Sequence, residues 1–358
     1  MASLSTCPPL TRQSVVEARE TIRHHIHETP VVSSEYLNRL ASTDRHDAAK
    51  NEVESSEAEF MQRAKPVMRL WFKCENMQKV GAFKARGAFH AVERLKQEPD
   101  WLENGGLRNH AQAVALAAQQ NSMPAHVVMP ETSSAVKIKS VETYGAQLTL
   151  CPRFDRELVA AQVIERTGAR LIPPYDHPDV ILGQGTCGLE LQHQTERLDA
   201  IISPSSGGGL LSGTALSCEG TGIRVYGAEP EFEGADDGRR GFLSGKRITH
   251  VESSTIADGL IGKLGQYPWD IIYERRLVDM MYAVSEEEIL QAMKLIYERL
   301  KLVVEPAAAV SLAVALYNEE FRQMVEKTAG EAGWDIGIIL SGGNIGTERM
   351  AELFSKLK

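Results

Sequence analysis

The chain has 358 residues, of which 43% are hydrophobic and 24% are charged, as in ordinary globular proteins. Its formal net charge of −9 argues against binding to nucleic acid or to an anionic membrane surface, because both select for excess lysine and arginine. The five cysteines are dispersed without a CxxC pair, a pattern unlike a disulfide framework or a structural zinc site.

The hydropathy pattern limits the location of the protein. No stretch reaches the ~18 apolar residues that a membrane span needs. The first residues, MASLSTCPPLTRQ, lack the basic and apolar segments of a signal peptide. We therefore expect no membrane partner and a cytoplasmic location. At ~100–200 residues per domain, the length predicts two domains or one large α/β unit.

The N-terminal part begins with a helical pattern and continues into a polar stretch. Residues 11–27 are predicted to form a helix because their apolar residues recur on one helical face. Thr29-Pro30 should end it, since the residue before proline avoids the α region. Residues 43–66 are polar and charged without a steady apolar period, which predicts a surface insertion that is a loop or disordered. A solvated helix is the alternative for this stretch.

Strand-like and helix-like segments then alternate along the chain. The expected strands are residues 70–72, 126–129, 147–151, 169–172, 200–203, 224–227 and 336–340. The expected helices are residues 85–95, 111–120, 134–144, 154–167, the segment after the glycines at 207–209, and the segment after the capping-box sequence Ser285–Glu288. This rhythm predicts an α/β protein with parallel sheets covered by helices.

A glycine-rich loop, Ser206–Gly209, follows the expected strand 200–203 and precedes an apolar helix. Glycines let the backbone approach a ligand, and a helix N-terminus offers N–H groups, so the loop predicts a phosphate site. A tight strand-to-helix turn is one alternative. A nicotinamide-dinucleotide site is another, since Gly207 and Gly209 fit GxG and Glu229 follows about 20 residues later. Ser212 stands where that fingerprint has its third glycine.

A second notable segment, Lys73–Ala88, reads KCENMQKVGAFKARGA. Lys84 follows Gly-Ala-Phe at the expected start of a helix, where the backbone can hold it in a defined place. A lysine buried beside a cofactor can form a Schiff base. For a lysine considered alone, a solvated position on a helix is far more common.

This segment resembles the Lys-x-Glu-Asn-x-Gln-x-x-Gly-Ser-Phe-Lys-x-Arg-Gly-Ala signature of pyridoxal-phosphate enzymes with the tryptophan-synthase β-like fold (fold type II). Within them it is most similar to the eukaryotic serine racemase and serine/threonine dehydratase group. The resemblance extends over Val15–Ile345, with residues 43–66 as the main extra. It implies a two-domain α/β fold with parallel-rich sheets flanked by helices and the cofactor in the interdomain cleft. Residues 1–98 and 172–358 would form the large domain, and 99–171 the small one.

The resemblance also implies which residues hold the cofactor. Lys84 would carry pyridoxal 5′-phosphate and later remove the substrate Cα proton. Asn109 would bond the pyridoxal 3-oxygen, and Ser341 would face the pyridine nitrogen. The loop around the 5′-phosphate would comprise Ser206, Gly207, Gly208, Gly209 and Leu210, and the family usually has glycine where Ser206 stands. A serine cannot keep the pyridine protonated as a carboxylate can, which favours expulsion of a β-substituent over a long-lived carbanion.

The implied substrate is a small hydroxy-amino acid such as serine, threonine or 3-hydroxyaspartate. Elimination of the β-hydroxyl as water would give a 2-oxo acid and ammonia, with serine racemisation as an accompanying or main activity. Asn109, His110 and Arg156 are expected near the substrate, and Glu305 is expected to line the cleft. A homodimer is implied, and no nucleic-acid partner.

In the racemase group the resemblance implies two further sites. Glu229, the Ala235 carbonyl and Asp237 would bind Mg²⁺ or Ca²⁺, because oxygen ligands suit hard cations. Two residues more than the pattern expects separate Glu229 from the other two ligands, and a solvated acidic loop is the alternative. An ATP effector site between subunits would involve Lys79, Gln112, Tyr144, Lys301 and Asn344. Surface lysines and a packed tyrosine would explain that set equally well.

One stretch departs from the family pattern. The family has a buried strand and then Ser-Ser-Gly-Asn-His, whereas here Gly106–Arg108 precede Asn109 and no strand is expected over 98–104. Leu107 has no proton to give, so two-base racemisation is in doubt and elimination is expected to be weaker. Arg108 would be able to replace lost carboxylate contacts. A specialised enzyme, a catalytically impaired pyridoxal-phosphate-binding protein and an error that removed a few codons from the gene sequence all remain open.

Overall fold

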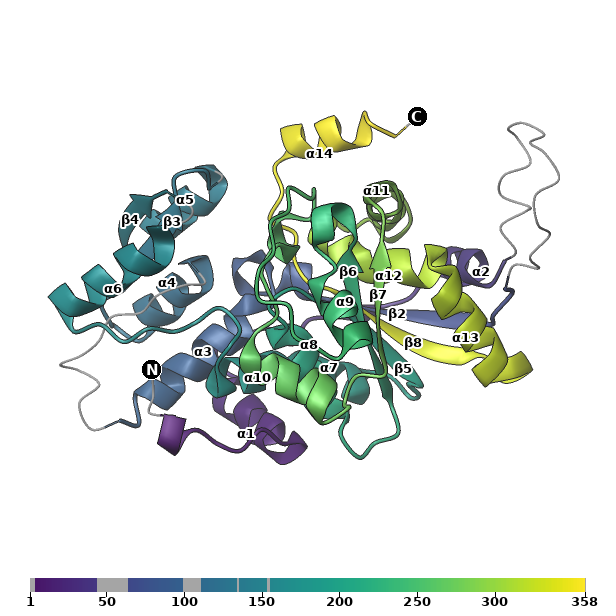
Figure 1. Ribbon diagram of the computed structural model, residues 1–358, viewed down its shortest axis with the longest axis horizontal. Coiled ribbons are helices and arrows are strands. Elements are labelled where there is room, and N and C mark those ends of the chain that lie inside the picture. The colour runs from purple at the N-terminus through teal and green to yellow at the C-terminus, as the bar shows by residue number, and fades with distance from the viewer. Residues whose placement is uncertain (1–3, 44–63, 99–110, 134, 153–154, 358) are drawn as a thin grey trace.

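The computed structural model describes residues 4–43, 64–98, 111–133, 135–152 and 155–357. These residues form a six-stranded sheet and a separate two-stranded sheet, each flanked by helices (Figure 1). The larger sheet has the order β1-β2-β8-β5-β6-β7 and is parallel except for the β1–β2 pair. The prediction of an α/β protein with parallel-rich sheets is confirmed.

The strands of the larger sheet are short and mostly buried on both faces, so they read as apolar runs rather than alternating patterns. They are β1 (Val31–Val32), β2 (Met68–Cys74), β5 (Ala200–Pro204), β6 (Arg224–Pro230), β7 (Met280–Val284) and β8 (Trp334–Leu340). The smaller sheet pairs β3 (His126–Pro130) with β4 (Gln147–Cys151) in parallel.

The helices cover both faces of the larger sheet. The core on one face includes α1 (Arg12–Ile22), α7 (Pro178–Gln194), α8 (Gly209–Cys218) and α10 (Gln266–Trp269). The core on the other face includes α2 (Glu35–Ser42), α11 (Glu286–Leu295), α12 (Pro306–Tyr317) and α13 (Glu319–Ala329). The remaining helices are α3 (Lys84–Leu95), α4 (Ala111–Gln120), α5 (Ala135–Thr143), α6 (Arg156–Thr167), α9 (Asp237–Ser244) and α14 (Thr347–Phe354).

The two sheets belong to two parts of the molecule. The smaller part contains β3, β4, α4, α5 and α6, which lie together at the left of Figure 1. Helix α3 contacts both α7 of the larger part and α4 of the smaller part. The division of the chain at residues 98 and 172 stays a prediction.

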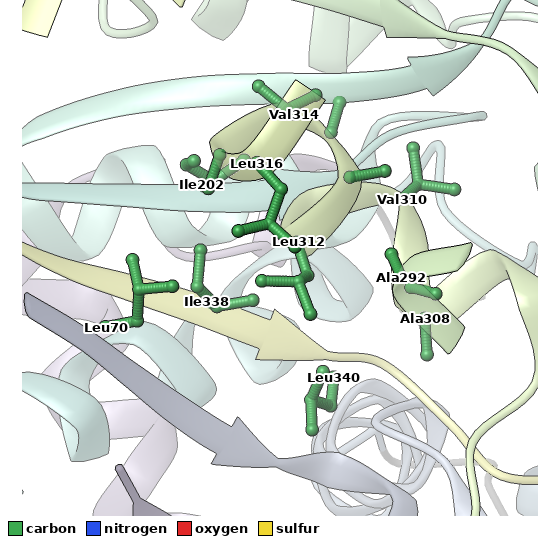
Figure 2. Packing of buried hydrophobic residues seen from close by; sticks show 14 of the residues in the cluster. Leu70, Ile202, Ala292, Ala308, Val310, Leu312, Val314, Leu316, Ile338 and Leu340 are labelled. Atoms are coloured by element: carbon green, nitrogen blue, oxygen red, sulfur yellow. The ribbon is translucent and has the colours of Figure 1, made fainter. Parts of the chain in front are cut away.

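The largest apolar core lies under α12, which is buried along almost its whole length. Neighbouring strand residues point to opposite faces, so Ile202 packs in this core while Ile201 packs in the core of α7 and α8. Figure 2 shows Leu312 of α12 close to Ile338 of β8. A helix that is apolar on all sides, as α12 is, belongs in such an interior.

The segment 169–172, expected to be a strand, is not one. Gly168 ends α6 in the left-handed conformation with φ of 67°, and the Ala169 N–H donates to Thr167 Oγ1 at 3.3 Å. Two prolines follow directly and have no N–H groups for strand pairing. Ile172 is nevertheless buried in a core with α3 and α4. The apolar pattern that suggested a strand therefore reflects packing.

Other differences concern where a helix ends and which elements the sequence did not predict. The helix expected over 11–27 ends at Ile22, where the His25 N–H bonds to the Ile22 carbonyl in a turn. The sequence did not indicate β1, β7, α2, α7, α9, α10, α12, α13 or α14. The capping box is present, since Ser285 and Glu288 each bond the backbone N–H of the other. The insertion at 43–66 lies mostly outside the described residues.

Candidate active site

A cavity of about 590 Å³ lies beside the carboxyl ends of β5 and β8, where open α/β sheets bind ligands. The larger part lines it with the start of α3, the loop between β5 and α8, and the residue after β8. Pro130 and Arg156 of the smaller part also line it. The cavity is thus bounded by both parts of the molecule.

Lys84 lines the cavity from the first position of α3. Its Nζ lies 4.5 Å from the centroid of the Phe83 ring. The Phe83 N–H donates to the Ser341 carbonyl at 3.1 Å, and Ala82 forms a β-bridge with Gly342. These contacts fix the backbone at Lys84 against the loop after β8, which is far away in the sequence.

Charged residues around Lys84 form a buried ion network. Arg86 donates to Glu75 and to Glu190 at 2.7 Å each, and Lys73 Nζ donates to Glu190 at 2.8 Å. Burial alone would raise the pKa of Glu190, but hydrogen bonds from Arg86 bring it below its ordinary value. The two cations and two anions balance, which offsets the cost of removing them from water. Because the network joins β2, α3 and α7, it holds the helix that begins with Lys84.

The glycine loop has the backbone geometry that its sequence requires. Gly208 has φ of +88°, a conformation that side chains disfavour, and a Cβ on Gly207 would clash with the ring of Tyr175. Gly208 is also the N-cap of α8 and has no side chain to occupy the N–H groups of the first turn. The loop geometry is compatible with a bound phosphate, and phosphate binding there stays a prediction. Sequence reasoning missed Tyr175, whose contact depends on the tertiary fold.

The side chain of Ser206 is held in place by hydrogen bonds. Its hydroxyl donates to the Gly262 carbonyl at 3.0 Å and accepts the Gly262 N–H at 2.8 Å. The serine that replaces the usual glycine thus joins the glycine loop to the segment around residue 262. Leu210, the last residue of the expected loop, lies in the first turn of α8 and lines the cavity.

Three further predicted residues line the same cavity. Ser341 is buried directly after β8, and Arg156 begins α6. Glu305 precedes α12, and its Oε1 would lie 2.5 Å from a Cβ on Gly342. The structure therefore brings Lys84, the glycine loop, Ser341, Arg156 and Glu305 together. The predicted residues Asn109 and His110, and the departure at Gly106–Arg108, lie outside the described residues.

The acids of the expected cation site are buried and do not line the cavity. Glu229 Oε2 accepts the Arg239 N–H at 2.8 Å, while Oε1 has no hydrogen-bond partner among the described residues. Burial and the charge of Asp237 raise the pKa of Glu229 well above its ordinary value. Burial raises the pKa of Asp237 to about 6. Two buried carboxylates, one of them with an oxygen that has no partner among the described residues, fit a hard cation, because its charge would offset the cost of removing them from water. Ala235, the third expected ligand, is also buried and is close to Asp237 in the sequence.

The residues of the expected nucleotide site are only partly grouped. Asn344 Nδ2 donates to the Val80 carbonyl at 2.9 Å, and Tyr144 packs on the same apolar cluster as Val80. Lys79, next to Val80, has its Nζ 5.4 Å from the Phe89 ring centroid. Gln112 Nε2 is buried with no partner among the described residues. Lys301 is exposed and donates to the Glu298 carbonyl at 2.6 Å.

Comparison with known sequences decides between the alternatives for the cofactor. The profile of the family described as "Pyridoxal-phosphate dependent enzyme" matches residues 57–342, which is well over half of the chain. The chain belongs to this family. The predicted resemblance is therefore confirmed, and pyridoxal phosphate is the cofactor that the family implies. Glu229, which a nicotinamide site would place at a ribose, is fully buried and does not line the cavity.

Individual relatives match this pyridoxal-phosphate family member along most of its length. It is 40% identical to L-threo-3-hydroxyaspartate ammonia-lyase of Saccharomyces cerevisiae over 96% of both chains. It is 37% identical to serine racemase of Dictyostelium discoideum over 97% of this chain and 98% of that one. The solved structure of maize serine racemase is 37% identical, with a TM-score of 0.81 over 97% of both chains. Among the described residues, no helix combines the length and apolar character needed to cross a membrane.

Proposed function

We propose that this protein is an enzyme that removes the Cα proton of a small hydroxy-amino acid and eliminates the β-hydroxyl as water, with a 2-oxo acid and ammonia as products. One observation carries the proposal: Lys84, the glycine loop and Ser341 line a single cavity. The named relatives, an ammonia-lyase for 3-hydroxyaspartate and serine racemases, favour serine, threonine or 3-hydroxyaspartate as the substrate. Serine racemisation would accompany elimination if a second acid/base faces Lys84.

The residues of the larger part would hold the cofactor and move the proton. Bound pyridoxal 5′-phosphate supplies an electron sink for the charge that develops at Cα. The Lys84 amine would hold the cofactor and then act as the base for the Cα proton, in a position fixed by the Phe83–Ser341 bond. Backbone N–H groups of residues 206–210 would bind the phosphate at the start of α8. Ser341 would offer a neutral hydroxyl to the ring nitrogen.

The smaller part would contribute to substrate binding. Arg156 lines the cavity and would bind a substrate carboxylate, since a guanidinium group pairs with a carboxylate through two parallel hydrogen bonds. Asn109 would contact both cofactor and substrate, and His110 would lie beside the substrate, as the resemblance implies. The division into a large domain and a small domain at residues 99–171 belongs to the same proposal.

Absorption spectroscopy and product assays test this function. Purified protein should show the visible band of lysine-bound cofactor, and Lys84→Ala should abolish the band and lower turnover by at least about 10³-fold. Lys263→Ala is the matched control, because Lys263 also lines the cavity without a proposed role. A wild-type protein without the band contradicts the proposal.

The assays also separate the remaining alternative. Serine, threonine and 3-hydroxyaspartate should be tested for 2-oxo acid and ammonia, and serine also for its D-enantiomer by chiral chromatography. An intact band without any of these products would identify a pyridoxal-phosphate-binding protein that lacks turnover. The sequence departure at Gly106–Arg108 is the observation that favours this second candidate.

We also propose that Glu229, Asp237 and the Ala235 carbonyl bind Mg²⁺ or Ca²⁺. Glu229 Oε1 is buried and has no hydrogen-bond partner in the part of the chain that the structure describes, which supports the site. Asp237 accepts the Leu264 N–H at 3.1 Å, and Leu264 Cδ1 would lie 2.5 Å from a Cβ on Gly208. A cation at this position would therefore stabilise the segment that packs on the glycine loop.

Chelation tests the cation site. At a hundred times its Kd, the cation should add about 2.7 kcal/mol to the free energy of unfolding, and EDTA should remove this increment. In protein freed of other metals beforehand, Glu229→Gln should no longer gain stability from added Mg²⁺, whereas Glu233→Gln, an exposed acid nearby, should respond like the wild type. A Glu229→Gln protein that still responds contradicts the assignment.

The proposed ATP effector site rests on the grouping of Lys79, Tyr144 and Asn344 near Val80. It also rests on Gln112 Nε2, which is buried without a hydrogen-bond partner among the described residues. Lys79→Ala should abolish a response of turnover to ATP, whereas Lys65→Ala should preserve it. An unchanged response in Lys79→Ala contradicts the assignment.

The proposed homodimer and cytoplasmic location have separate support. Met77 and Val303 are large apolar residues that are exposed, as residues of a subunit interface would be in a monomer. Their two segments are adjacent, because Asn76 Nδ2 donates to the Val303 carbonyl at 3.1 Å. Light scattering of the purified protein measures the assembly, and a monomer at micromolar concentration contradicts the homodimer. All five cysteines are unpaired, which supports a reducing compartment. Fractionation of cells measures the location.

A further inference from the structure

A second group of metal-ligating side chains lies outside the lining of the large cavity. Cys7 in the N-terminal segment and His177 and Asp179 at the start of α7 place a thiol sulfur, an imidazole nitrogen and a carboxylate oxygen within 4.8 Å of one another. The group shares no residue with the proposed Mg²⁺ or Ca²⁺ site. We propose that Cys7, His177 and Asp179 bind a transition-metal ion, with Zn²⁺ as the preferred metal.

Two of the three side chains are buried with unused polar atoms. His177 is 3% exposed and Asp179 is 1% exposed. Within the described chain, His177 Nε2 and Asp179 Oδ1 have no hydrogen-bond partner. Arg94 Nε approaches Asp179 Oδ1 only to 3.5 Å and is itself without a hydrogen bond. The opposite atoms of the two side chains, His177 Nδ1 and Asp179 Oδ2, lie toward Cys7, and a bound cation would replace the hydrogen bonds that these two atoms make now.

A small void lies beside two of the three proposed ligands. A void of about 10 Å³ is lined by His177 and Asp179 and otherwise by apolar groups such as Leu95 and Ile172. This volume is about that of one water-sized sphere. The surrounding apolar wall would exclude other anions and would strengthen the attraction between the ion and its ligands.

The distances are close to those of a tetrahedral site. Cys7 Sγ lies 3.7 Å from Asp179 Oδ2, and His177 Nδ1 lies 3.9 Å from the same oxygen. With zinc–ligand bonds of 2.0–2.3 Å, tetrahedral geometry requires ligand atoms roughly 3.4–3.6 Å apart. The Cys7–Asp179 and His177–Asp179 pairs would each need to approach by a few tenths of an ångström, and all three ligand atoms lie within 4.8 Å of one another. Cys7 lies outside any long helix and is only half-buried, so its segment is able to make this adjustment.

The ligand types select the metal. A thiolate and an imidazole favour Zn²⁺ or Co²⁺ over Mg²⁺ and Ca²⁺, which prefer oxygen ligands alone. On binding, the Cys7 thiol would lose its proton to solvent, and the two negative ligands would balance the dication. His177 Nδ1 accepts the Asp179 N–H at 3.2 Å as the N-cap of α7. Histidine is not among the favoured N-cap residues, so replacing this hydrogen bond with a metal bond would cost α7 little stability.

A metal at this position would tie the N-terminal segment to the frame of the active site. Arg94 Nη2 of α3 already donates to the Thr6 carbonyl at 2.6 Å, next to Cys7. His177 follows Tyr175, whose ring packs on Gly207 of the phosphate loop, by two residues. The metal would therefore connect the N-terminal segment, α3 and α7 near the cofactor loop.

Cobalt titration of the holoenzyme tests the proposal, because a thiolate ligand gives Co²⁺ a near-ultraviolet charge-transfer band. The protein is first treated with chelator and then held in excess Mg²⁺, so that the oxygen-ligand site is saturated. The difference spectrum should show the band at one equivalent of Co²⁺, and Zn²⁺ should remove it. Cys7→Ser should abolish the band, whereas Cys218→Ser and Glu229→Gln should retain it. An absent band, or a band that survives in Cys7→Ser, overturns the proposal.

A second variant separates loss of a ligand from loss of structure. His177→Asn removes the imidazole but keeps an N-cap residue that helices favour, so α7 should remain intact. Circular dichroism and the cofactor band check this expectation. The variant should bind Co²⁺ at least tenfold more weakly than the wild type. Equal affinity would show that His177 is not a ligand and would overturn the site as assigned.

Discussion

The larger and the smaller part of the molecule bury their strands to different extents. Every residue of β5 and β8 is buried. In β4 of the smaller part only Cys151 is buried, and the two cores on its sheet contain three buried residues each. Local opening requires less free energy where fewer apolar groups are buried, so the smaller part is expected to open first.

This difference corresponds to the proposed division of the chemistry. The groups expected to hold the cofactor, from Lys84 to Ser341, are on the larger part, where packing fixes their positions. Arg156, expected to meet the substrate, is on the smaller part. Catalytic groups need positions defined to a fraction of an ångström, whereas a substrate-binding segment has to admit and release ligands. The larger core thus suits the groups that need fixed positions, and the smaller core suits the segment that has to admit and release the substrate.

The largest expected effect on stability comes from the ion network of the larger part. Arg86→Met should lower the free energy of unfolding by about 3–5 kcal/mol, because it leaves Glu75 and Glu190 buried without their main partner. Denaturant unfolding followed by tryptophan fluorescence measures the change. Arg349→Met removes an exposed ion pair and should leave the transition where it is in the wild type. Equal effects of the two variants would contradict the role of the network.

The larger part should also determine how the free energy of unfolding falls at alkaline pH. Burial raises the pKa of Tyr226 from its ordinary value to about 12. The unfolded chain therefore loses this proton near pH 10 and the folded protein only near pH 12. Stability should fall by about 2.7 kcal/mol as the pH rises between these values. Tyr226→Phe should reduce this pH dependence, and Tyr297→Phe, on an exposed residue, should not. Unfolding measured across this pH range decides the question.

A smaller effect is expected at the glycine loop, where the phosphate is proposed to bind. Gly207→Ala places a methyl group against the Tyr175 ring and should weaken cofactor binding at least tenfold, or by about 1.4 kcal/mol. Cofactor titration followed by the visible band measures the affinity. The second substitution in Gly207→Ala/Tyr175→Ala should restore part of the loss, and Gly346→Ala should have no effect. Wild-type affinity in Gly207→Ala would contradict the close packing described for this loop.

The smallest expected effect lies in the smaller part. Val141→Ala removes two methyl groups from a three-residue core and should promote local opening by about 1 kcal/mol. Hydrogen exchange should increase in residues 126–151 and remain unchanged in 200–204. Val310→Ala in α12 should instead lower the global free energy of unfolding. Uniformly faster exchange after Val141→Ala would show that the two parts unfold together.

The sequence contained most of the sheet pattern but not its exceptions. Apolar runs at β5 and β8 predicted the parallel sheet correctly, and the phosphate site predicted from the glycines after β5 stays a prediction. The same reasoning failed at residues 169–172, because apolar residues that fill a core resemble those that pair in a strand. It also missed β7, although its five residues are strongly apolar. Local patterns report burial, and only the fold decides which buried segments form hydrogen-bonded pairs.

Contacts between distant residues were beyond sequence reasoning. The cofactor residues were placed by resemblance to a family, and the structure brings those that it describes to one cavity. No local signal joins Glu190 to Arg86, or Tyr175 to Gly207, because these pairs meet only in the folded chain. Cysteine spacing argued against a zinc site, since spacing rules detect only ligands that follow one another closely. The approach of Cys7 to Asp179 requires the tertiary fold.

The position of β8 has a consequence for synthesis on the ribosome. This last strand lies between β2 and β5 and pairs with both, so it joins the two halves of the larger sheet. Until residues 334–340 leave the exit tunnel, the nascent chain has two unjoined half-sheets with unpaired edges, which favour association with other chains. Ser341, the Ala82–Gly342 bridge and the anchor beside Lys84 also arrive only at that moment. Cofactor capture should therefore follow the emergence of this strand, and chains stalled before it should need chaperones to protect those edges.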